Sequence, residues 1–285
     1  MEKPDGVAEI LIEAIPYINR FVGKTVVVKM GGSTMDSDQT VLQDVASLKR
    51  LGVNPVLVHG GGPEISDWMR RVDKKPQFVE GLRVTDQETL DIATMVLRGK
   101  VNAELVARLN GMGVPAVGLC GTDAGLFQAV QRDRRLGYVG DVTRVDLRLL
   151  SLLTAQGYLA VVAPIALGEG GQLLNVNGDT AAGELAAALC AEKLIFFTDV
   201  AGIQDKEGKL LPQLTAAEAE RLILSGTVTG GMIPKVRACM KALTTTGRTH
   251  IIDGRVPHAL LKELFTDAGV GTMIVAAGEG LSREV

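Results

Sequence analysis

The sequence predicts an α/β fold built around an open, mostly parallel sheet. Residues 25–33 and 55–63 each join an apolar, strand-like run to consecutive glycines, and Pro63 suits the first turn of a helix. A helical pattern over residues 41–52 connects the two strands, which predicts a β-α-β unit with parallel strands. Glycines let backbone N–H groups approach a ligand closely, and helix N-termini attract anions. These strand ends therefore predict a phosphate site, where Lys29 supplies a positive charge.

Composition limits the classes of protein to consider. The chain has 285 residues, of which 46% are hydrophobic, so it can bury one large core or the cores of two lobes. Its 30 basic and 33 acidic side chains give a formal charge of −3 without a run of like charge, which leaves no footprint for nucleic acid or an anionic membrane. Cys120, Cys190 and Cys239 are widely spaced, which argues against a metal site and for a reducing compartment. Without a signal pattern or a membrane-length apolar run, we expect a cytoplasmic protein.

Residues 7–22 predict a helix that precedes the first strand. Apolar residues follow helical spacing there, but Pro16 should kink or split the helix. The segment either packs on its own subunit or forms an arm that reaches a neighbouring subunit, and the spacing favours neither interpretation.

Two predicted helices follow the glycine turns. The helix after Pro63 should bury one apolar face. That face consists of Ile65, Trp68, Met69 and Val72. Thr85 and Glu88 fit a capping box that opens a long helix to about residue 109. Arg83 stands just before this helix, and its rigid guanidinium fork suits a carboxylate.

Two glycine motifs resemble nucleotide-binding signatures without meeting their requirements. Gly111-Met-Gly113 follows a helix and precedes a strand at residues 116–119, whereas a dinucleotide fingerprint needs strand, glycines and helix in that order. We interpret it as a helix end. Gly23-Lys-Thr lacks the glycine five places earlier that a P-loop requires, because Ile18 stands there.

The remaining strands follow from shorter patterns. Residues 126–145 predict short antiparallel strands, as a flap at the sheet edge, and a helix near residues 146–156 leads to a strand at residues 159–162. A buried strand beginning at Leu194 ends in Thr198-Asp199 and a glycine turn, and Thr215 with Glu218 caps the next helix. Two more strands, near residues 251–253 and 272–274, close the sheet.

Polar residues gather at the predicted strand ends in a set that suits phosphoryl transfer. Four of them fall within six residues, which exceeds the needs of helix capping: Asn175, Asn177, Asp179 and Thr180. Lys29 and Lys235 both stand beside glycine pairs. Backbone N–H groups, lysines and Mg²⁺ can position and neutralise a phosphoryl group without a covalent intermediate. No general base stands out, which fits an acceptor carboxylate that is already ionised at neutral pH.

Five motifs, in this order and spacing, resemble the amino acid kinase family. They are Lys29-Met-Gly-Gly, His59-Gly-Gly-Gly-Pro, Gly81-Leu-Arg-Val-Thr, Asn175-Val-Asn-Gly-Asp and Gly230-Gly-Met-Ile-Pro-Lys235. The resemblance runs from about residue 8 to 275 and is close to the members that phosphorylate N-acetyl-L-glutamate. It implies a three-layer αβα sandwich in two lobes. The implied parts are an N-terminal kinked helix at residues 1–24, an acceptor-substrate lobe at residues 25–176 and a nucleotide-binding lobe at residues 177–285.

The resemblance also implies a catalytic role for particular residues. Lys29 and Lys235 should stabilise the transferring phosphoryl group, and Asp179 should orient both lysines. Gly32 and Gly61 should donate backbone hydrogen bonds to that group. The implied reaction converts ATP and N-acetyl-L-glutamate to ADP and N-acetyl-L-glutamyl 5-phosphate, an early step of arginine synthesis.

The two substrates should occupy different parts of this site. By resemblance, Arg83 should bind a substrate carboxylate. The acceptor site is completed by Gly61, Gly62, Asn175 and Asn177. The nucleotide side is expected at Thr198, Asp199, Val200, Gly202, Gly230 and Met232. Mg²⁺ should bridge the ATP phosphates and be held mostly by nucleotide and water, because the sequence offers no dedicated carboxylate cluster.

Regulation is a further hypothesis from the resemblance. The N-terminal segment resembles the kinked helix of the hexameric, arginine-inhibited members, which form trimers of dimers, and this favours the arm interpretation. In those members the L-arginine pocket lies in the C-terminal lobe near this helix. The residues in matching segments here are Lys193, His250, Glu263 and Gly271. Some relatives also bind a PII signalling protein, and nothing in this sequence decides that point.

Three rival functions remain to be weighed. A kinase for a carrier-linked aminoadipate would share the fold and both lysines, but the N-terminal arm disfavours it. A non-catalytic amino-acid sensor is disfavoured because the chain retains Lys29, Asp179 and Lys235. A dinucleotide oxidoreductase is disfavoured by the misplaced glycine fingerprint. Since this fold hosts several acceptors, function must be argued from the site.

Overall fold

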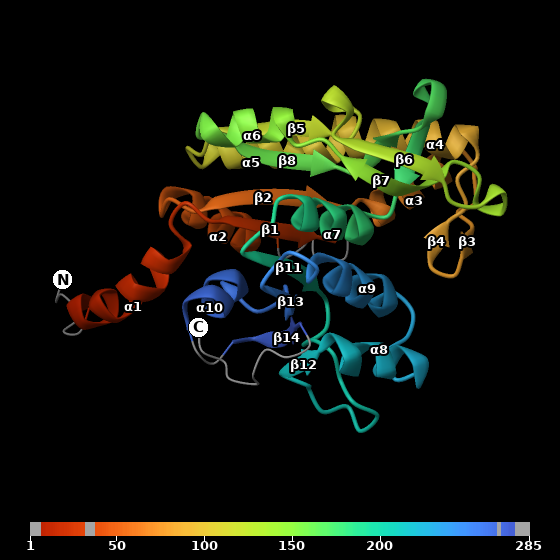
Figure 1. Ribbon diagram of the computed structural model, residues 1–285. Helices are drawn as coiled ribbons and strands as arrows, with labels where there is room; N and C mark the ends of the chain where they lie inside the picture. Colours follow the sequence, from red (N-terminus) through yellow and green to blue (C-terminus); the bar gives the residue numbers. More distant parts are fainter. Residues whose placement is uncertain (1–6, 32–37, 267–268, 277–285) are drawn as a thin grey trace.

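The computed structural model describes residues 7–31, 38–266 and 269–276 of the chain. Its central element is an eight-stranded sheet with the order β12-β14-β13-β11-β1-β2-β8-β5 (Figure 1). The strands are β1 (Thr25–Met30), β2 (Asn54–His59), β5 (Ala116–Cys120), β8 (Leu159–Ala163), β11 (Lys193–Thr198), β12 (Gln213–Thr215), β13 (Arg248–Asp253) and β14 (Gly271–Val275). Every neighbouring pair is parallel except β13 and β14. The predicted open, mostly parallel sheet is confirmed.

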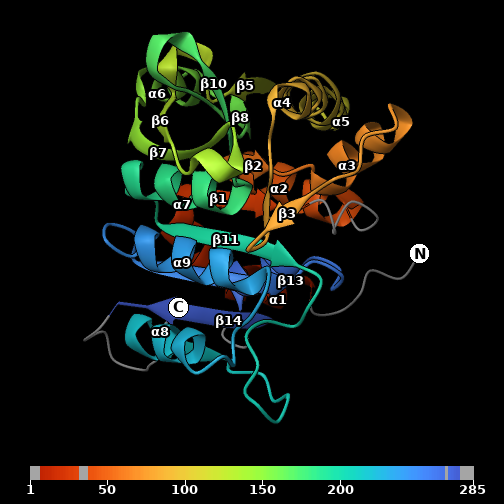
Figure 2. The same ribbon diagram turned by 90° about the vertical axis from the view of Figure 1, so that its right-hand side faces the viewer.

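Alternate residues of the central strands enter two separate hydrophobic cores. On β1, Val26 and Val28 join one core and Val27 joins the other, because successive side chains of a strand point to opposite faces. The first core packs against α2 (Asp38–Arg50), α3 (Gly62–Arg71), α4 (Gln87–Thr94), α5 (Asn102–Gly111) and α10 (Ala259–Phe265). The second packs against α6 (Arg148–Ala155), α7 (Gly178–Ala188), α8 (Ala216–Leu224) and α9 (Met232–Ala242). Helix, sheet and helix therefore form the expected three layers (Figure 2).

A small closed barrel differs from the predicted edge flap. Strands β6 (Phe127–Gln131) and β7 (Val139–Val145) are antiparallel, as expected. They close into a barrel with β9 (Ile165–Leu167) and β10 (Leu173–Val176), in the order β10-β7-β6-β9. The flap prediction was wrong because the closing strands lie later in the chain and local alternation does not reveal long-range pairing. The barrel brings β10 beside the start of α7.

The helix after Pro63 buries only half of its predicted apolar face. Ile65 and Met69 are buried, but Trp68 and Val72 are 39% and 50% exposed. The Arg71 guanidinium lies over the Trp68 ring at 4.8 Å, so the ring is covered by a neighbouring cation instead of the sheet.

The long helix begins with a different cap from the one predicted. Asp86, not Thr85, accepts the hydrogen bond from Thr89 N, and α4 starts at the next residue. The Thr85 hydroxyl instead donates to Arg83 O. The helix then passes through a π-helical segment, η2 (Met95–Val101), into α5, which ends at Gly111 as expected. The second predicted capping box, Thr215 with Glu218, is confirmed at the start of α8.

The N-terminal helix α1 (Val7–Phe21) extends away from the rest of the molecule (Figure 1). Pro16 lies inside it without splitting it. Phe21 anchors its end, since this ring is buried and meets Phe265 edge-on with ring centroids 6.0 Å apart. Ile12 and Ile15, farther from the anchor, are exposed. Within the described part of the chain, no helix has the length and apolar character needed to cross a membrane.

Close contact between α7 and α9 depends on Gly183. A Cβ there would lie 2.9 Å from Ala238 O and 3.0 Å from Ala238 Cβ. We expect Gly183→Ala to lower the free energy of unfolding by roughly 1–3 kcal/mol, because neither backbone can give way easily. Gly99→Ala is the control, since a Cβ at this helical position would meet nothing within 4 Å. Urea denaturation followed by circular dichroism should show the control at least as stable as the wild type, and equal losses would contradict the packing argument.

Candidate active site

The site lies at the carboxyl edge of the central sheet. Strands β1, β2 and β11 are parallel neighbours, and Lys29 lies in register with Val58 and Phe196. Glycine-rich turns follow β1 and β2, and α7 begins nearby with its N-terminus at Gly178. Ligands of open α/β sheets bind at this edge because the loops there diverge from the strand ends.

One carboxylate joins two lysines at the centre of the site. Asp179 Oδ1 lies 2.7 Å from Lys29 Nζ, and Asp179 Oδ2 lies 3.1 Å from Lys235 Nζ. Lys29 comes from β1, Asp179 from the first turn of α7 and Lys235 from the first turn of α9. The structure therefore brings together three residues that are up to 206 positions apart in the sequence, counted as 235 − 29.

The electrostatics of this cluster follow from burial and from the opposite charges. Burial lowers the pKa of Lys29, and the Asp179 charge opposes that effect. Burial alone would raise the pKa of Asp179, but the charges and hydrogen bonds of Lys29 and Lys235 bring it below its usual value. Asp179 is therefore an anion at neutral pH and is unsuited to act as a general base.

Asn177 holds Asp179 in place by capping α7. Its Oδ1 accepts hydrogen bonds from Asp179 N at 2.9 Å and from Thr180 N at 3.1 Å. This N-cap fixes the first turn of the helix, from which the Asp179 carboxylate projects toward the lysines. Capping explains Asn177, but it does not explain Asn175, which lies on β10.

A cavity of about 350 Å³ opens beside the lysine pair. Its lining includes Lys29, Asp179 and Lys235 together with Gly61, Gly62, Arg83, Asn175 and Asn177. Every acceptor residue expected from the sequence thus lies around one cavity. Gly32 falls outside the described residues.

Arg83 presents a positive charge at the wall of this cavity. Its Nη2 donates hydrogen bonds to Gly62 O and Ser66 Oγ, both at 2.8 Å, and its guanidinium lies 4.8 Å from the Phe78 ring centroid. Among the described residues, no carboxylate lies within ion-pair distance of Arg83. Burial lowers the pKa of Arg83, as expected for a cation without an anionic partner. A carboxylate bound in the cavity would supply that partner.

His59 and Asn102 support the glycine turn after β2 from behind. Asn102 Nδ2 donates to Val161 O at 2.9 Å and lies 3.1 Å from His59 Nε2. Because an amide nitrogen can only donate, His59 Nε2 is the acceptor of that bond. The proton of the ring is therefore on His59 Nδ1, which donates to Gly60 O at 2.9 Å. Burial lowers the pKa of His59 to about 4, so the ring is neutral. Sequence reasoning assigned no role to Asn102. The feature of the sequence that could have pointed to it is the glycine at position 118, because a Cβ there would lie 2.0 Å from Asn102 Oδ1.

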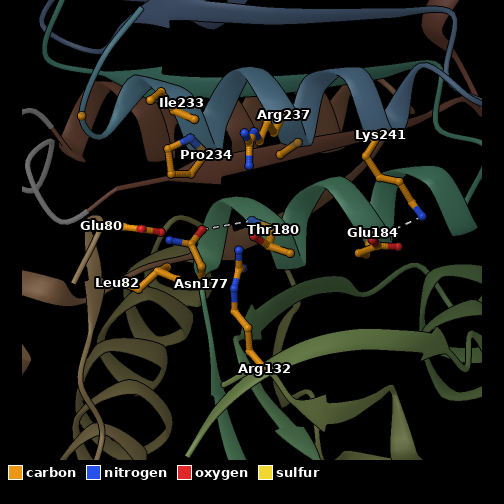
Figure 3. Close-up of a pocket in the computed structure, with 13 residues that line it drawn as sticks. Glu80, Leu82, Arg132, Asn177, Thr180, Glu184, Ile233, Pro234, Arg237 and Lys241 are labelled. Atoms are coloured by element: carbon orange, nitrogen blue, oxygen red, sulfur yellow. Dashed lines mark hydrogen bonds and ion pairs between the residues drawn. The ribbon is translucent and has the colours of Figure 1, made fainter. Parts of the chain in front are cut away.

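A second cavity, of about 660 Å³, adjoins the first between α7, α9 and the barrel. Figure 3 shows Arg132 and Arg237 approaching Thr180 from opposite sides of it. Asn177 and Gly230 also line this cavity.

The expected nucleotide residues fall into two groups. Gly230, with φ of +55°, and Met232 lie at the start of α9, beside Lys235. Thr198 ends β11, and Asp199, Val200 and Gly202 lie in the loop that follows it. A Cβ at Gly202 would lie 2.7 Å from Thr272 Oγ1, so glycine lets this loop pack closely on β14. Residues 198–202 line neither of the two cavities described.

The residues expected for regulation form a separate cluster at the opposite end of β11. Lys193 Nζ lies 3.2 Å from His250 Nε2, and His250 Nδ1 lies 2.6 Å from Glu263 Oε1. Burial lowers the pKa of Lys193 to about 8 and that of His250 to about 4. Lys193 also lies 5.6 Å from the Phe21 ring centroid on α1. Gly271 begins β14, where a Cβ would lie 2.2 Å from Ile251 O.

One carboxylate holds two ammonium groups beside glycine-rich turns. Such a group of charges can stabilise the charge that spreads over a transferring phosphoryl group. The class of protein that this chemistry and the fold define is an α/β phosphotransferase. The chain belongs to the amino acid kinase family, which it matches over residues 24–253.

Individual relatives agree with this assignment. The chain is 52% identical over 284 residues to acetylglutamate kinase from Symbiobacterium thermophilum, with 94% of this chain and 97% of that protein covered. It is 50% identical over 277 residues to acetylglutamate kinase from Nostoc punctiforme, with 94% and 93% covered.

Solved structures share the fold. N-acetylglutamate synthase from Neisseria gonorrhoeae, complexed with coenzyme A and N-acetyl-glutamate, matches with a TM-score of 0.85 at 28% identity. That match covers 95% of this chain and 64% of the synthase. Carbamate kinase from Giardia lamblia bound to AMP-PNP matches with a TM-score of 0.67 at 17% identity and covers 89% of this chain and 98% of that one, a likeness of fold alone.

Replacing Asp179 by Asn should destabilise the protein in a pH-dependent way. At pH 7 the free energy of unfolding should fall by about 3 kcal/mol, because Lys29 stays buried without its counter-ion. The folded pKa of Asp179 lies below its ordinary value of 3.8, so its contribution is complete above about pH 4 and is lost as the pH falls through the folded pKa. The gap between wild type and variant should therefore shrink in acid.

Urea denaturation between pH 3 and pH 7 measures this gap. Asp67→Asn is the control, because Asp67 pairs with Arg70 and Arg71 on the exposed face of α3 and should change stability by less than about 0.5 kcal/mol. If wild type and Asp179→Asn have the same free energy of unfolding, or if their difference is equally large at every pH, the role of the buried carboxylate is contradicted.

Proposed function

We propose that this protein transfers the γ-phosphoryl group of ATP to the side-chain carboxylate of N-acetyl-L-glutamate, giving N-acetyl-L-glutamyl 5-phosphate and ADP in arginine synthesis. The observation that carries the proposal is that one cavity is lined both by Arg83 and by the Lys29–Asp179–Lys235 cluster. Arg83 suits a carboxylate that is bound, and the lysine cluster suits a carboxylate that reacts with a phosphoryl group. The relatives named above, about half identical along nearly their whole length, support the same acceptor.

The chain's own residues supply position and charge for this reaction. The acceptor carboxylate is already ionised at neutral pH, so its oxygen can attack the γ-phosphorus without a general base. A bond forms between that oxygen and phosphorus, and the bond to the β,γ-bridging oxygen breaks, so ADP leaves with the electron pair. Lys29 and Lys235 neutralise the charge on the phosphoryl oxygens, and Asp179 keeps both ammonium groups directed at them.

Backbone groups and the start of α9 complete the phosphate site. Gly61 and Gly62 line the cavity where α3 begins, and the first N–H groups of a helix have no partner within the helix, so they are available to a phosphate. A Cβ at Gly61 would lie 2.7 Å from Leu97 Cδ2, so the absence of a side chain leaves room for Leu97 of η2. We place ATP against Gly230 and Met232 and the loop at residues 198–202.

Mg²⁺ would enter with the nucleotide. Within the described ranges, no three carboxylate, imidazole or thiol groups come together in a way that could hold a metal ion. The Asp179 carboxylate is already shared by two lysines. The donor set therefore fits a cation bound mainly by ATP phosphates and water, whose chemistry is to offset phosphate charge.

An assay of ADP release from MgATP tests the proposal directly. N-acetyl-L-glutamate, L-glutamate, L-aspartate and α-aminoadipate are compared as acceptors. Turnover with N-acetyl-L-glutamate alone is the expected result. Turnover with α-aminoadipate in place of N-acetyl-L-glutamate would favour the lysine-pathway kinase, and absence of turnover with every acceptor would favour a sensor.

Arg83→Ala should raise the KM for N-acetyl-L-glutamate by roughly ten-fold or more and leave the KM for ATP nearly unchanged. The reason is that a charged hydrogen bond to the substrate carboxylate is lost in ground state and transition state alike. Arg71→Ala is a matched control, because Arg71 also lies 4.8 Å over an aromatic ring but on the exposed face of α3. Equal changes of both KM values in the Arg83 variant would reject its role in binding the acceptor.

We also propose that L-arginine inhibits the enzyme at the Lys193–His250–Glu263 cluster and that the chain forms a homohexamer, a trimer of dimers. The cluster offers a buried carboxylate beside α1, and a cationic amino acid needs such a partner. The exposed Ile12 and Ile15 on the projecting part of α1 fit a contact with a neighbouring subunit. Lys193 over the Phe21 ring links the cluster to this arm.

Glu263→Gln should weaken arginine inhibition by at least about ten-fold, because the amide lacks the charge that a guanidinium or ammonium group requires. Its kcat without arginine should stay within about two-fold of wild type. Glu104→Gln is the control, since Glu104 pairs with Lys100 on an exposed helix face. Wild-type turnover that is insensitive to arginine, or unchanged inhibition in Glu263→Gln, would sink this regulatory proposal and leave the catalytic one intact.

A further inference from the structure

Thr85 lies behind the acceptor cavity and contacts two residues that line it. The side chain is fully buried, and its hydroxyl donates a hydrogen bond to Arg83 O at 2.9 Å. Asn175 Nδ2 lies 3.2 Å from the same hydroxyl oxygen. Arg83 belongs to β4 (Leu82–Arg83), which pairs with β3 (Phe78–Val79), whereas Asn175 belongs to the barrel. One hydroxyl group therefore joins the two halves of the acceptor site.

The main chain holds Thr85 rigidly against the barrel. Thr85 N donates to Leu136 O at 2.9 Å, and Tyr138 N donates to Thr85 O at 2.7 Å. A Cβ at Gly137 would lie 2.2 Å from Thr85 O, so glycine is needed for this approach. Asn175 N in turn donates to Tyr138 O at 2.8 Å. The hydroxyl is thus held at a fixed place relative to the Asn175 side chain.

The number of protons on the hydroxyl determines how the Asn175 amide is oriented. A threonine hydroxyl has one proton, and Thr85 gives it to Arg83 O. Its oxygen can then only accept a hydrogen bond from Asn175, so Nδ2 faces Thr85. The other branch of the amide, Oδ1, is consequently the one left for the cavity that Asn175 lines. The wall of the cavity therefore offers an acceptor beside the cation of Arg83.

We propose that Thr85 is a positioning residue that selects an N-acylated acceptor, by holding Asn175 with Oδ1 toward the cavity and by fixing the main chain of Arg83. A molecule with a neutral N–H next to a carboxylate satisfies both groups at once. A free amino acid places an ammonium charge close to Arg83 and both lysines, which costs electrostatic energy. This inference rests on the proposed function and deepens it.

Steady-state kinetics of Thr85→Val and Thr85→Ser test the inference. Valine keeps the shape but loses the hydroxyl, so the KM for N-acetyl-L-glutamate should rise roughly ten-fold while the KM for ATP changes less than about two-fold. The ratio of kcat/KM for N-acetyl-L-glutamate to that for L-glutamate should fall, because the Asn175 amide can then rotate. Serine restores the hydroxyl and should bring the acceptor KM to within about three-fold of wild type. Thr85→Ala gives a second variant without the hydroxyl if valine does not fold.

Thr249→Val is the matched control. Thr249 is equally buried, and its hydroxyl donates to Ile274 O at 3.4 Å within the sheet, away from the acceptor cavity. It should leave both KM values unchanged. Equal increases of both KM values in Thr85→Val, a similar rise in Thr249→Val, or failure of serine to restore binding would show a merely structural role and overturn the inference.

A second measurement separates this inference from the proposed function. If the wild type turns over none of the acceptors, the proposed function fails, and crystal structures of wild type and Thr85→Val decide the role of Thr85. Rotation or displacement of the Asn175 amide in the variant supports positioning. Identical places for Arg83 and Asn175 in both structures reject it.

Discussion

The structure depends on one buried carboxylate, that of Asp179, which pairs with two lysines. Without Asp179, the ammonium groups of Lys29 and Lys235 would repel each other at the edge of the sheet, and Lys29 would be buried without a counter-ion. Asp179 also connects a strand with two helices, because its partners come from β1 and α9. The charge that we propose serves phosphoryl transfer is therefore also a constraint on how α7 and α9 pack against the sheet.

Small residues make this arrangement sterically possible. Gly183 lets α9 approach α7, which sets the distance between Lys235 and Asp179. Gly61 and Gly137 do the same on the acceptor side, where η2 and the loop before α4 come within contact of the cavity wall. A side chain at Gly183 or Gly137 would meet the backbone of Ala238 or Thr85, so these glycines help to set the shape of the proposed site.

The proposed acceptor site is assembled from segments that lie far apart in the sequence. Arg83 comes from a short hairpin, Asn175 from a barrel strand and Gly61 from a helix start. Buried groups that touch no substrate join these parts. Thr85 connects the hairpin to the barrel, and Asn102 connects the neutral His59 to the neighbouring strands. Such supporting contacts account for the precision of a site whose direct ligands lie on separate elements.

The sequence by itself determined the parallel sheet and the glycine turns, because strand periodicity and turn chemistry are local, and the motifs shared with the amino acid kinase family single out Lys29, Asp179, Lys235 and Arg83 as candidates. Only the tertiary structure decided that residues 126–145 close into a barrel, that Trp68 stays at the surface and that Asp86 replaces Thr85 as the helix cap. The barrel depends on strands β9 and β10 later in the chain, and Thr85 is held by contacts with Leu136, Tyr138 and Asn175. The contacts that a hydroxyl group or an aromatic ring makes depend on which neighbours the folded chain brings close to it. A local sequence pattern does not carry that information.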